Sequence, residues 1–524
     1  MSPSAGLSPR IENVQLQDGN LTWTYVENQQ RGHATIDEVL FTLQPAQNTL
    51  QKTSQQSSSP TIICCLKEDS TQSPLFSLHL LTTADAGIPE ALLTHAPRLS
   101  PTCLPDHLQS TPTNKVDVIL STKAGTGRGQ SFWTLVLRPL LELLLSLSQD
   151  DNDAASASET GQQKEPWKVL TTQDEQTVRL YAKELHHENS PHRTIILISG
   201  DGGIVDLLNG CEANTQALAP HLLALIPLGT ANALFHSLHK GLEADPGPTP
   251  LVLALRTLFL GTPRDLPMFK ALFTPGSRIV SYTSATNDDK IDLDDKIDLD
   301  DKIDLDDKID LDDKIDLDDK ATAPLARTDT AVSHLYGAIV ASHALHASIV
   351  HESDTPEYRI HGRARFSMVA EKLLQESHPY QATLEVQSAR AASPAIYRHI
   401  TPDTHSYILL SMVSNLERNF TISPATKPLD GTLHLVHIGA VDSQKIMQAM
   451  TGAYQGGTHT LLEWDNGERV LYEQVDRVRI TTQEEDARWR KFCVDGTIVE
   501  VGRGGGMEVE RVEEVMFRVL VPGG

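Results

Sequence analysis

The strongest constraint on the fold is a series of short apolar runs between residues 116 and 227, several of them followed by a glycine-bearing loop. Four predicted strands alternate with three predicted helices, at 116–120, 131–147, 167–170, 174–186, 193–198, 204–209 and 222–227. Alternation of this kind is typical of a parallel sheet covered by helices. Ligands of such sheets bind beyond the carboxyl ends of the strands, so we expect a site in the loops that follow them.

The length of the chain predicts more than one domain. A chain of 524 residues exceeds what a single hydrophobic core usually holds. Residues 1–110 contain short β-type runs between polar turns and predict a small β-rich region. Residues 113–263 hold the α/β pattern, and strand-like runs dominate 264–524, which predicts a second, largely β domain.

A tandem repeat interrupts this second domain. Five copies of Lys-Ile-Asp-Leu-Asp-Asp run through 290–319, and residues 288–320 hold 17 Asp and 6 Lys. A six-residue period matches neither the α-helix nor the heptad, and the closely spaced carboxylates repel one another. The tract also lacks the turn glycines of calcium-binding β-helix repeats. We therefore expect 288–320 to be a disordered, solvated insertion.

Charge and cysteine content limit the partners and the compartment. The formal net charge of −25 argues against nucleic acid as a partner, because binding its phosphates needs clustered Lys and Arg. Five cysteines with no CxxC or zinc-site spacing favour a reduced, intracellular compartment. The most apolar stretch, 135–147, is interrupted by Arg138, Pro139 and Glu142, so no transmembrane segment is expected.

The first glycine-bearing loop lies between a predicted strand and a predicted helix. It holds Ser121, Lys123, Gly125 and Gly127, and its backbone N–H groups are placed to bind a phosphate at the start of the helix. The loop has neither the Gly-Lys-Ser/Thr of a Walker A motif nor the third glycine of the Rossmann fingerprint. Taken alone, it fits either a phosphate site or a plain tight turn.

Two further loops carry a sharper signal. The second, Ser199-Gly200-Asp201-Gly202-Gly203, surrounds one carboxylate with glycines, so backbone amides can approach a polyphosphate beside Asp201. Such a carboxylate can accept a proton from an attacking hydroxyl or hold a magnesium ion. The third loop places Gly229, Thr230 and Asn232 at the next strand-to-helix junction. Three such loops at successive strand ends predict one nucleotide site.

These loops resemble the three ordered motifs of the diacylglycerol kinase catalytic domain. The matching segments are 118–127, 199–210 and 226–234. Residues 342–354, followed by Tyr358-Arg359, Gly362 and Arg365-Phe366, are similar to the segment that opens the second domain of sphingosine and ceramide kinases. Weaker matches lie at 430–436 and 494–496. The resemblance covers residue 116 to the C-terminus and leaves 1–110 and the repeat unmatched.

The resemblance implies a fold, cofactors and residue roles. It implies an α/β fold class: an α/β nucleotide-binding domain followed by a largely antiparallel β-sandwich, with the active site in the cleft between them. Asp201 would be the general base, ATP and Mg²⁺ the cofactors, and Asp201 with Glu352 the metal ligands. Ser348 would lie at the substrate. The residues implied in nucleotide binding are Ser121, Lys123, Gly125, Gly127, Ser199, Gly200, Gly202, Gly203, Gly229, Thr230, Asn232, Glu352, Arg359, Arg365, Asp495 and Gly496.

Some of these roles stay open. Arg359 and Arg365 fit forked phosphate ligands or surface ion-pair partners, and Glu352 fits a metal-side group or an exposed carboxylate. The chain also departs from the family pattern, with Ser121-Thr122 for Asn-Pro, Asp206 for Glu, Ser348 for Asp and Thr497 for Glu. The change at Ser348 weakens the case for a cationic sphingoid base as the substrate.

The function that follows is an ATP-dependent lipid kinase that phosphorylates the primary hydroxyl of a sphingoid base or a related lipid. Ceramide and diacylglycerol are alternative substrates. A non-catalytic nucleotide- or lipid-binding pseudokinase and an NAD kinase-like enzyme are alternative functions. We expect a cytoplasmic protein, peripherally associated with the membrane that presents its lipid substrate, and homodimerisation is left open.

Overall fold

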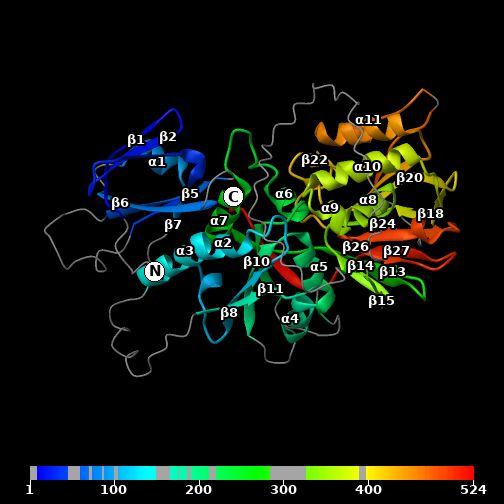
Figure 1. Ribbon diagram of the computed structural model, residues 1–524, viewed down its shortest axis with the longest axis horizontal. Helices are drawn as coiled ribbons and strands as arrows, with labels where there is room; N and C mark the ends of the chain where they lie inside the picture. Colours follow the sequence, from blue (N-terminus) through cyan, green and yellow to red (C-terminus); the bar gives the residue numbers. More distant parts are fainter. Residues whose placement is uncertain are drawn as a thin grey trace, which may run out of the picture.

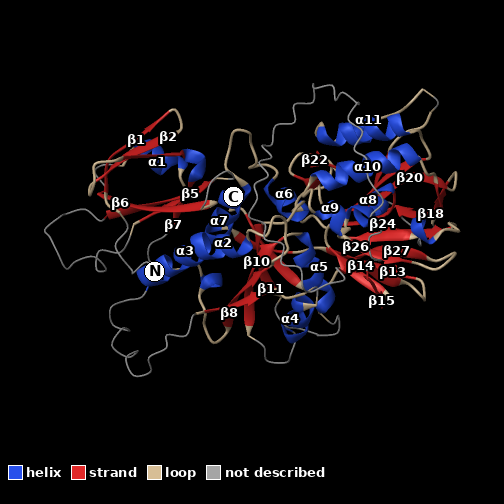
Figure 2. Ribbon diagram, in the orientation of Figure 1, coloured by secondary structure: helices blue, strands red, loops and turns tan. Residues whose placement is uncertain are grey.

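The computed structural model describes residues 9–44, 60–69, 74–84, 88–99, 104–148, 166–174, 176–185, 191–211, 220–283, 326–388, 397–465 and 467–523. The acidic repeat expected at 288–320 lies outside the described residues. Figure 1 shows a small β module at the left, a central α/β sheet, and a large β region at the right. Figure 2 shows that helices lie over one side of this large β region.

The central sheet has six strands in the order β12–β28–β11–β10–β8–β9. Its strands are β8 Asn114–Leu120, β9 Trp167–Thr171, β10 His192–Ser199, β11 His221–Pro227, β12 Thr262–Asp265 and β28 Phe517–Val521. All pairs are parallel except that of β12 with β28. The four strands predicted from the apolar runs are confirmed. Residues 195–198 of β10 are all apolar and buried, because both faces of the sheet are covered.

Helices cover both faces of this sheet. They are α2 Gly129–Phe132, η4 Trp133–Leu137, α3 Arg138–Ser148, α4 Thr177–Leu185, α5 Asp201–Gly210, α6 Ala233–His239 and α7 Pro250–Leu260. The continuous helix 129–148 is long and apolar enough to cross a membrane by length and composition alone. Its Phe132, Val136 and Leu140 are fully buried in the protein core. The π-helical turn η4 ends two residues before Pro139, which has no N–H for the normal helical bond.

The N-terminal module consists of two small sheets, β1–β2–β3 and β6–β5–β4–β7. Its elements are β1 Ile11–Gln17, β2 Asn20–Tyr25, β3 Arg31–Thr35, η1 Ile36–Glu38, β4 Val39–Leu43, β5 Pro60–Glu68, β6 Phe76–Ala84, α1 Glu90–His95, β7 Arg98–Leu99 and η3 Asp106–Leu108. The expectation of a β-rich N-terminal region is confirmed.

The second domain is built on an antiparallel sheet with 13 strands among the described residues. Within it, β18, β20, β23 and β24 pair in a closed ring. The strands are β13 Met268–Phe273, β14 Arg278–Thr283, β15 Ala326–Ala331, β16 His334–Gly337, β17 Val340–Ala344, β18 Tyr380–Ser388, β19 Arg398–Ile400, β20 Thr404–Ser411, β23 Leu433–Gly439, β24 Leu471–Thr482, β25 Lys491–Val494, β26 Thr497–Glu500 and β27 Gly506–Val512. The hairpin β21 Asn415–Glu417 and β22 Phe420–Thr421 forms a separate pair.

The second domain also contains helices, several of which lie together at the upper right of Figure 1. They are α8 Leu345–Ser353, α9 Pro356–Arg359, α10 Ala364–Glu376, α11 Ser443–Tyr454, η5 Thr458–Leu461 and η6 Ala487–Trp489. The expectation of a largely antiparallel second domain is confirmed.

The end of the chain returns to the first domain. Strand β28 inserts between β11 and β12 of the central sheet. The sequence pattern instead predicts that all of 264–524 belongs to the second domain. The described chain therefore crosses between the two domains twice. A short apolar run such as 517–521 predicts a strand, but it carries no local information about the strand with which it pairs.

Candidate active site

The three glycine-bearing loops meet at the carboxyl ends of β8, β10 and β11. The N–H of Ser121 donates to the carbonyl of Ile198 at 3.0 Å, and the N–H of Leu228 donates to the carbonyl of Ser199 at 3.2 Å. A Cβ atom on Gly229 would overlap the Cα of Gly200. Close approach of the loops therefore needs glycine at this contact, whatever else the residues do.

The first loop also rests against the third. Gly125 and Gly127 have φ angles of +55° and +72°, which favour glycine. A Cβ on Gly125 would overlap the carbonyl oxygen of Leu228. Lys123 is exposed beside this contact. The structure thus brings the three predicted loops together in one place.

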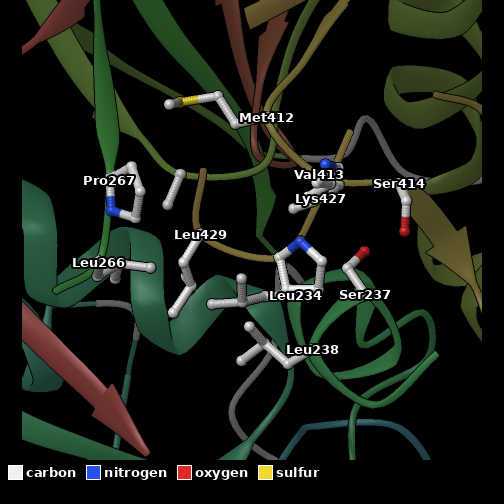
Figure 3. A pocket seen from close by; sticks show the side chains of 12 residues that line it. Leu234, Ser237, Leu238, Leu266, Pro267, Met412, Val413, Ser414, Lys427 and Leu429 are labelled. Atoms are coloured by element: carbon white, nitrogen blue, oxygen red, sulfur yellow. The ribbon is translucent and has the colours of Figure 1, made fainter. Parts of the chain in front are cut away.

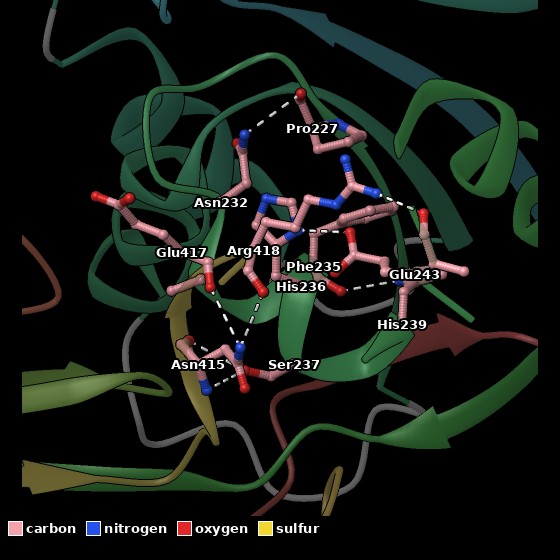
Figure 4. Close-up of polar contacts among 12 residues, drawn as sticks. Pro227, Asn232, Phe235, His236, Ser237, His239, Glu243, Asn415, Glu417 and Arg418 are labelled. Atoms are coloured by element: carbon pink, nitrogen blue, oxygen red, sulfur yellow. Dashed lines mark hydrogen bonds and ion pairs between the residues drawn. The ribbon is translucent and has the colours of Figure 1, made fainter. Parts of the chain in front are cut away.

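Asn232 shapes the third loop. It has a left-handed backbone, with φ of 54°, and precedes α6. Its side chain accepts the N–H of Gly229 at 3.0 Å and donates to the carbonyls of Gly229 at 2.9 Å and Pro227 at 3.4 Å, the last of these drawn in Figure 4. Thr230 is half-buried within the loop that Asn232 holds. The supporting role expected for Asn232 therefore has a geometric basis.

Asp201 joins the second loop to the helix after the third. Its carboxylate accepts the N–H groups of Ala233 at 2.8 Å and Leu234 at 3.3 Å. These bonds satisfy donors of the first turn of α6, which otherwise have no partner. Burial raises the pKa of Asp201, while these N–H groups act in the opposite direction. Asp201 thus has a structural task in addition to the chemical one proposed for it.

Gly202 and Gly203 begin α5 directly after Asp201. A Cβ on Gly202 would meet no atom within 4 Å, whereas one on Gly203 would press against Leu197 and Ser199 at 3.0 Å. The open side of Gly202 is therefore the part of this loop with room for a ligand.

A second buried carboxylate, Asp495, belongs to the other domain. With Gly496 it forms the turn between β25 and β26, at φ angles of 45° and 89°, which fit a type I′ hairpin. It accepts N–H groups from Ala338 at 2.7 Å, Ile339 at 3.1 Å and Val340 at 2.6 Å. Burial raises its pKa to about 7, and the charge of Asp201 adds to this effect.

The two carboxylates therefore lie near one another across the domain interface. Asp495 and Gly496 form a turn, and the Asp495 carboxylate binds the backbone of the loop between β16 and β17. Their predicted contact with the nucleotide remains a prediction.

The arginines expected to bind phosphate surround an acidic residue. Arg359 forms a forked pair with Asp354 at 3.1 and 2.8 Å, and Arg365 lies 3.7 Å from the same carboxylate. The Nε of Arg365 is buried and has no hydrogen-bond partner among the described residues. This geometry fits the ion-pair alternative for both arginines, and it leaves Arg365 with an unused donor.

Glu352 is also paired within the protein. It accepts from Arg488 at 2.8 Å and lies 3.6 Å from Lys372. In the described part of the chain, no group of three or more His, Cys, Asp or Glu is placed to hold a metal ion. Magnesium in kinases needs only one or two carboxylates, because substrate phosphates and water complete its shell. Asp201 fits that requirement better than Glu352, whose charge is already balanced.

Ser348, the residue expected at the substrate, lies in the core of the second domain. It is 3% exposed, and its hydroxyl accepts a hydrogen bond from Tyr380 at 2.8 Å. A side chain buried and paired in this way is not presented to a lipid head group in this conformation.

Asp206, the family departure on α5, forms an ion pair with Arg179 of α4 at 2.8 Å. Its shorter side chain therefore serves the packing of two helices in this structure.

Sequence reasoning missed the residues that clamp the two domains together. Asn209 on α5 accepts the N–H of Tyr336 and donates to its carbonyl, both at 2.8 Å. Ser237 on α6 exchanges bonds with the backbone of Asn415 at 3.0 and 3.1 Å, as drawn in Figure 4. The only sequence signal for Asn209 is its place in the 199–210 motif, and that signal does not identify its partner.

Apolar side chains fill the same junction. Leu234 and Leu238 of α6 face Leu266, Met412 and Leu429 around a small pocket, shown in Figure 3. His236 of α6 forms a buried pair with Glu243, which lies after the end of this helix; the two side chains are 2.7 Å apart and are drawn in Figure 4. The interface next to the loops is therefore closely packed.

Two glycines of the site offer a test of this geometry. Gly229→Ala should lower the melting temperature, because its Cβ would overlap Gly200 and lie 2.8 Å from Oδ1 of Asn232. Gly202→Ala should leave it unchanged or raise it, since alanine in a helical turn is favoured over glycine by up to about 1 kcal/mol. Thermal unfolding followed by circular dichroism measures both. An unchanged melting temperature for Gly229→Ala would show that the loops do not meet as described.

Comparison with known proteins shows that one protein family matches the part of the chain that contains these loops. The family model described as diacylglycerol kinase catalytic domain matches residues 115–271. None of the curated proteins that were compared matches the chain.

Three similar solved structures are of diacylglycerol kinases from Bacillus anthracis str. Sterne, two of them described as putative. They are 14%, 14% and 15% identical, with TM-scores of 0.41, 0.42 and 0.43. Each match covers 78% of this chain and 96% to 98% of the other.

The matched segment contains all three loops, Asp201 and the helices that carry them. Residues 115–271 therefore match the diacylglycerol kinase catalytic domain, and the matched segment is the part of the chain in which the three loops meet.

Proposed function

We propose that this protein is an ATP-dependent lipid kinase that phosphorylates the primary hydroxyl of a sphingoid base or a related lipid. The observation that supports this best is the meeting of three glycine-bearing loops beside Asp201, within the segment matched by the kinase family. Backbone N–H groups in glycine-rich loops are suited to polyphosphate, because no side chain separates them from the ligand.

In this proposal the loops position the nucleotide and Asp201 acts on the acceptor. The hydroxyl oxygen of the lipid attacks the γ-phosphorus, its proton passes to the Asp201 carboxylate, and ADP leaves. Each Asp201 oxygen accepts one N–H from α6, which fixes the carboxylate and leaves further lone pairs for a proton. The raised pKa of Asp201 makes it a stronger base than an exposed aspartate.

Magnesium would enter this site with the nucleotide. Asp201 is the described carboxylate that fits it, and the ion would supply positive charge on the phosphates. Glu352 would first have to exchange Arg488 for the ion.

The lipid itself is a finer proposal. Sphingoid bases, ceramide and diacylglycerol all carry a primary hydroxyl, so the proposed chemistry serves each of them. Because Ser348 is buried, the expected contact between its side chain and the lipid head group is absent. Ser348 therefore gives no reason to prefer a cationic lipid to a neutral one. We further propose that the protein meets its lipid at a membrane surface, as a peripheral cytoplasmic enzyme.

A pseudokinase is the second candidate, and specific contacts favour it. Glu352, Arg359 and Arg365, all expected near the nucleotide, are engaged with or lie beside protein partners. If those pairs persist when nucleotide binds, binding would occur without turnover.

Purified protein with labelled ATP distinguishes these functions. We expect a labelled product with at least one of sphinganine, phytosphingosine, ceramide and diacylglycerol in mixed micelles. Nucleotide binding without any labelled lipid would support the pseudokinase. Labelled product from NAD but from no lipid would point to an NAD kinase-like enzyme.

A further inference from the structure

The N-terminal module shares its core with the kinase domain. Strand β5 is buried along residues 61–66, and its side chains alternate between two different cores. Ile62, Cys64 and Leu66 belong to the core under α2, α3 and α7. Ile63 and Cys65 belong to the interior of the module. The sheet of β5 thus lies between the module's other sheet and the helices of the kinase domain, as Figure 1 shows.

The module packs on the helix that follows the first loop. Phe76 of β6 meets Phe132 edge to face, with ring centroids 5.4 Å apart. Phe132 is fully buried and lies three residues after Gly129, where the helix begins. Leu66 pairs with Leu78, two residues along β6 from Phe76, and belongs to the same core as Phe76 and Phe132. A change at Phe76 or Leu66 would therefore act on the packing of the first helical turn after the loop.

The module also holds α7 of the kinase domain. Phe41 meets Phe259 with centroids 5.4 Å apart. Arg256 donates to the carbonyl of Val39 at 2.6 Å, a bond that ties the helix to the backbone of β4. Through these contacts the module packs directly against the kinase domain.

A polar contact reaches the loop itself. The carboxylate of Glu68, at the end of β5, accepts a hydrogen bond from Thr249, the N-cap of α7. Arg128, the last residue of the first loop, is close enough for its charge to act on Glu68. The Nε of Arg128 is buried and finds no hydrogen-bond partner in the described part of the chain. The end of the loop therefore lies beside the module, and the Nε of Arg128 is a donor that the described residues leave unused.

We propose that the N-terminal β module positions the first phosphate-binding loop, with Leu66 and Phe76 as the positioning residues, and so sets the affinity for the nucleotide. A loop held in its bound shape loses less conformational freedom when the ligand binds, and this gain appears as affinity. The part that concerns the nucleotide rests on the proposed kinase function. The positioning of the loop can be measured without it.

Leu66→Ala and Ile63→Ala form a matched pair for the test. Both remove three carbons from the same strand, but Leu66 faces the kinase helices and Ile63 faces the module interior. In the full-length protein, Leu66→Ala should speed amide hydrogen exchange in peptides that cover 121–137. It should also raise the Kd for a non-hydrolysable ATP analogue, measured by calorimetry, by about fivefold. Ile63→Ala should lower the melting temperature with little change in either quantity.

Two further measurements separate the outcomes. If Leu66→Ala does not fold, Phe76→Leu removes the ring contact while keeping most of the apolar volume, and should have the same effects in weaker form. With active enzyme, KM for ATP should rise while kcat stays near the wild-type value. Equal exchange at 121–137 in the two strand variants would overturn the proposal. Failure of the wild type to bind the analogue would refute the nucleotide function, and the exchange data would still decide whether the module holds the loop.

Discussion

Asp201→Asn should lower the turnover of the lipid substrate by about 10²-fold to 10⁴-fold, the usual contribution of a general base. The amide cannot take the proton of the attacking hydroxyl, whereas the phosphate-binding loops remain in place. Binding of an ATP analogue should therefore persist. Initial rates with labelled ATP, together with calorimetric binding to the same preparation, measure the two quantities separately.

The structure adds a complication to this experiment. Both Asp201 oxygens accept N–H groups of α6, and asparagine offers only one oxygen for the two donors. Loss of a helix cap costs about 1 kcal/mol, so part of any defect is structural. Asp442→Ala controls for a lost cap, since Asp442 caps α11 through the N–H of Lys445 at 3.0 Å, far from the three loops in sequence, and alanine at such a position costs about 1 kcal/mol.

The two variants should lose similar stability but differ strongly in turnover. Wild-type turnover in Asp201→Asn would remove the general base from the mechanism. A loss of turnover that matches the fraction of unfolded protein would leave Asp201 with a structural role alone.

Acidification from pH 7 to pH 5 should destabilise the fold strongly. Burial lowers the pKa of His239 and His343 to about 4 and that of His437 to about 3. In the unfolded chain these groups titrate near 6.5, so below that pH the unfolded state binds protons that the folded state does not. Their stabilisation is complete above about pH 6.5 and is lost toward the folded pKa values, at up to about 1.4 kcal/mol per pH unit for each group.

Asp495 acts in the opposite direction. Its folded pKa of about 7 lies above the unfolded value, so its contribution is present at low pH and is lost as the pH rises through 7. Between pH 5 and pH 7, the change that Asp495 makes to the free energy of unfolding cancels that of about one of the three histidines. Each group contributes the same limiting slope of this free energy against pH. The net effect remains a loss of stability in acid.

Melting temperatures measured by circular dichroism from pH 7.5 to pH 5 test this sign. His343→Phe should flatten the dependence, because a phenyl ring can keep the stacking on Phe492, at 4.5 Å between centroids, without a titrating group. His361, which is exposed, supplies the control: His361→Gln should leave the slope unchanged. Equal slopes in His343→Phe and the wild type would contradict the assignment.

Local patterns were enough to predict the central sheet and its loops. The apolar runs at 116–120 and 193–198 became β8 and β10, since a strand buried on both faces needs a continuous apolar stretch. The convergence of the loops also followed, because parallel strands end at the same edge of a sheet.

The contacts between distant segments could not be predicted. The partners of Glu352 and Asn209 are Arg488 and the backbone of Tyr336, which lie 136 and 127 residues away. A charged or amide side chain in a motif fits several partners equally well, and only the folded chain selects one. The same holds for β28, whose run of apolar residues is compatible with either sheet.

The sequence by itself determined the class of the sheet, the place of the three loops and the residue types that suit phosphate chemistry. These follow from periodicity, from glycine and from strand direction, all of which act over a few residues. The tertiary structure decided that Asp201 caps α6, that Ser348 is buried on Tyr380, and that β5 of the N-terminal module serves two cores. Such features depend on packing between segments far apart in the chain, where the energy of a contact exists only once both sides are in place.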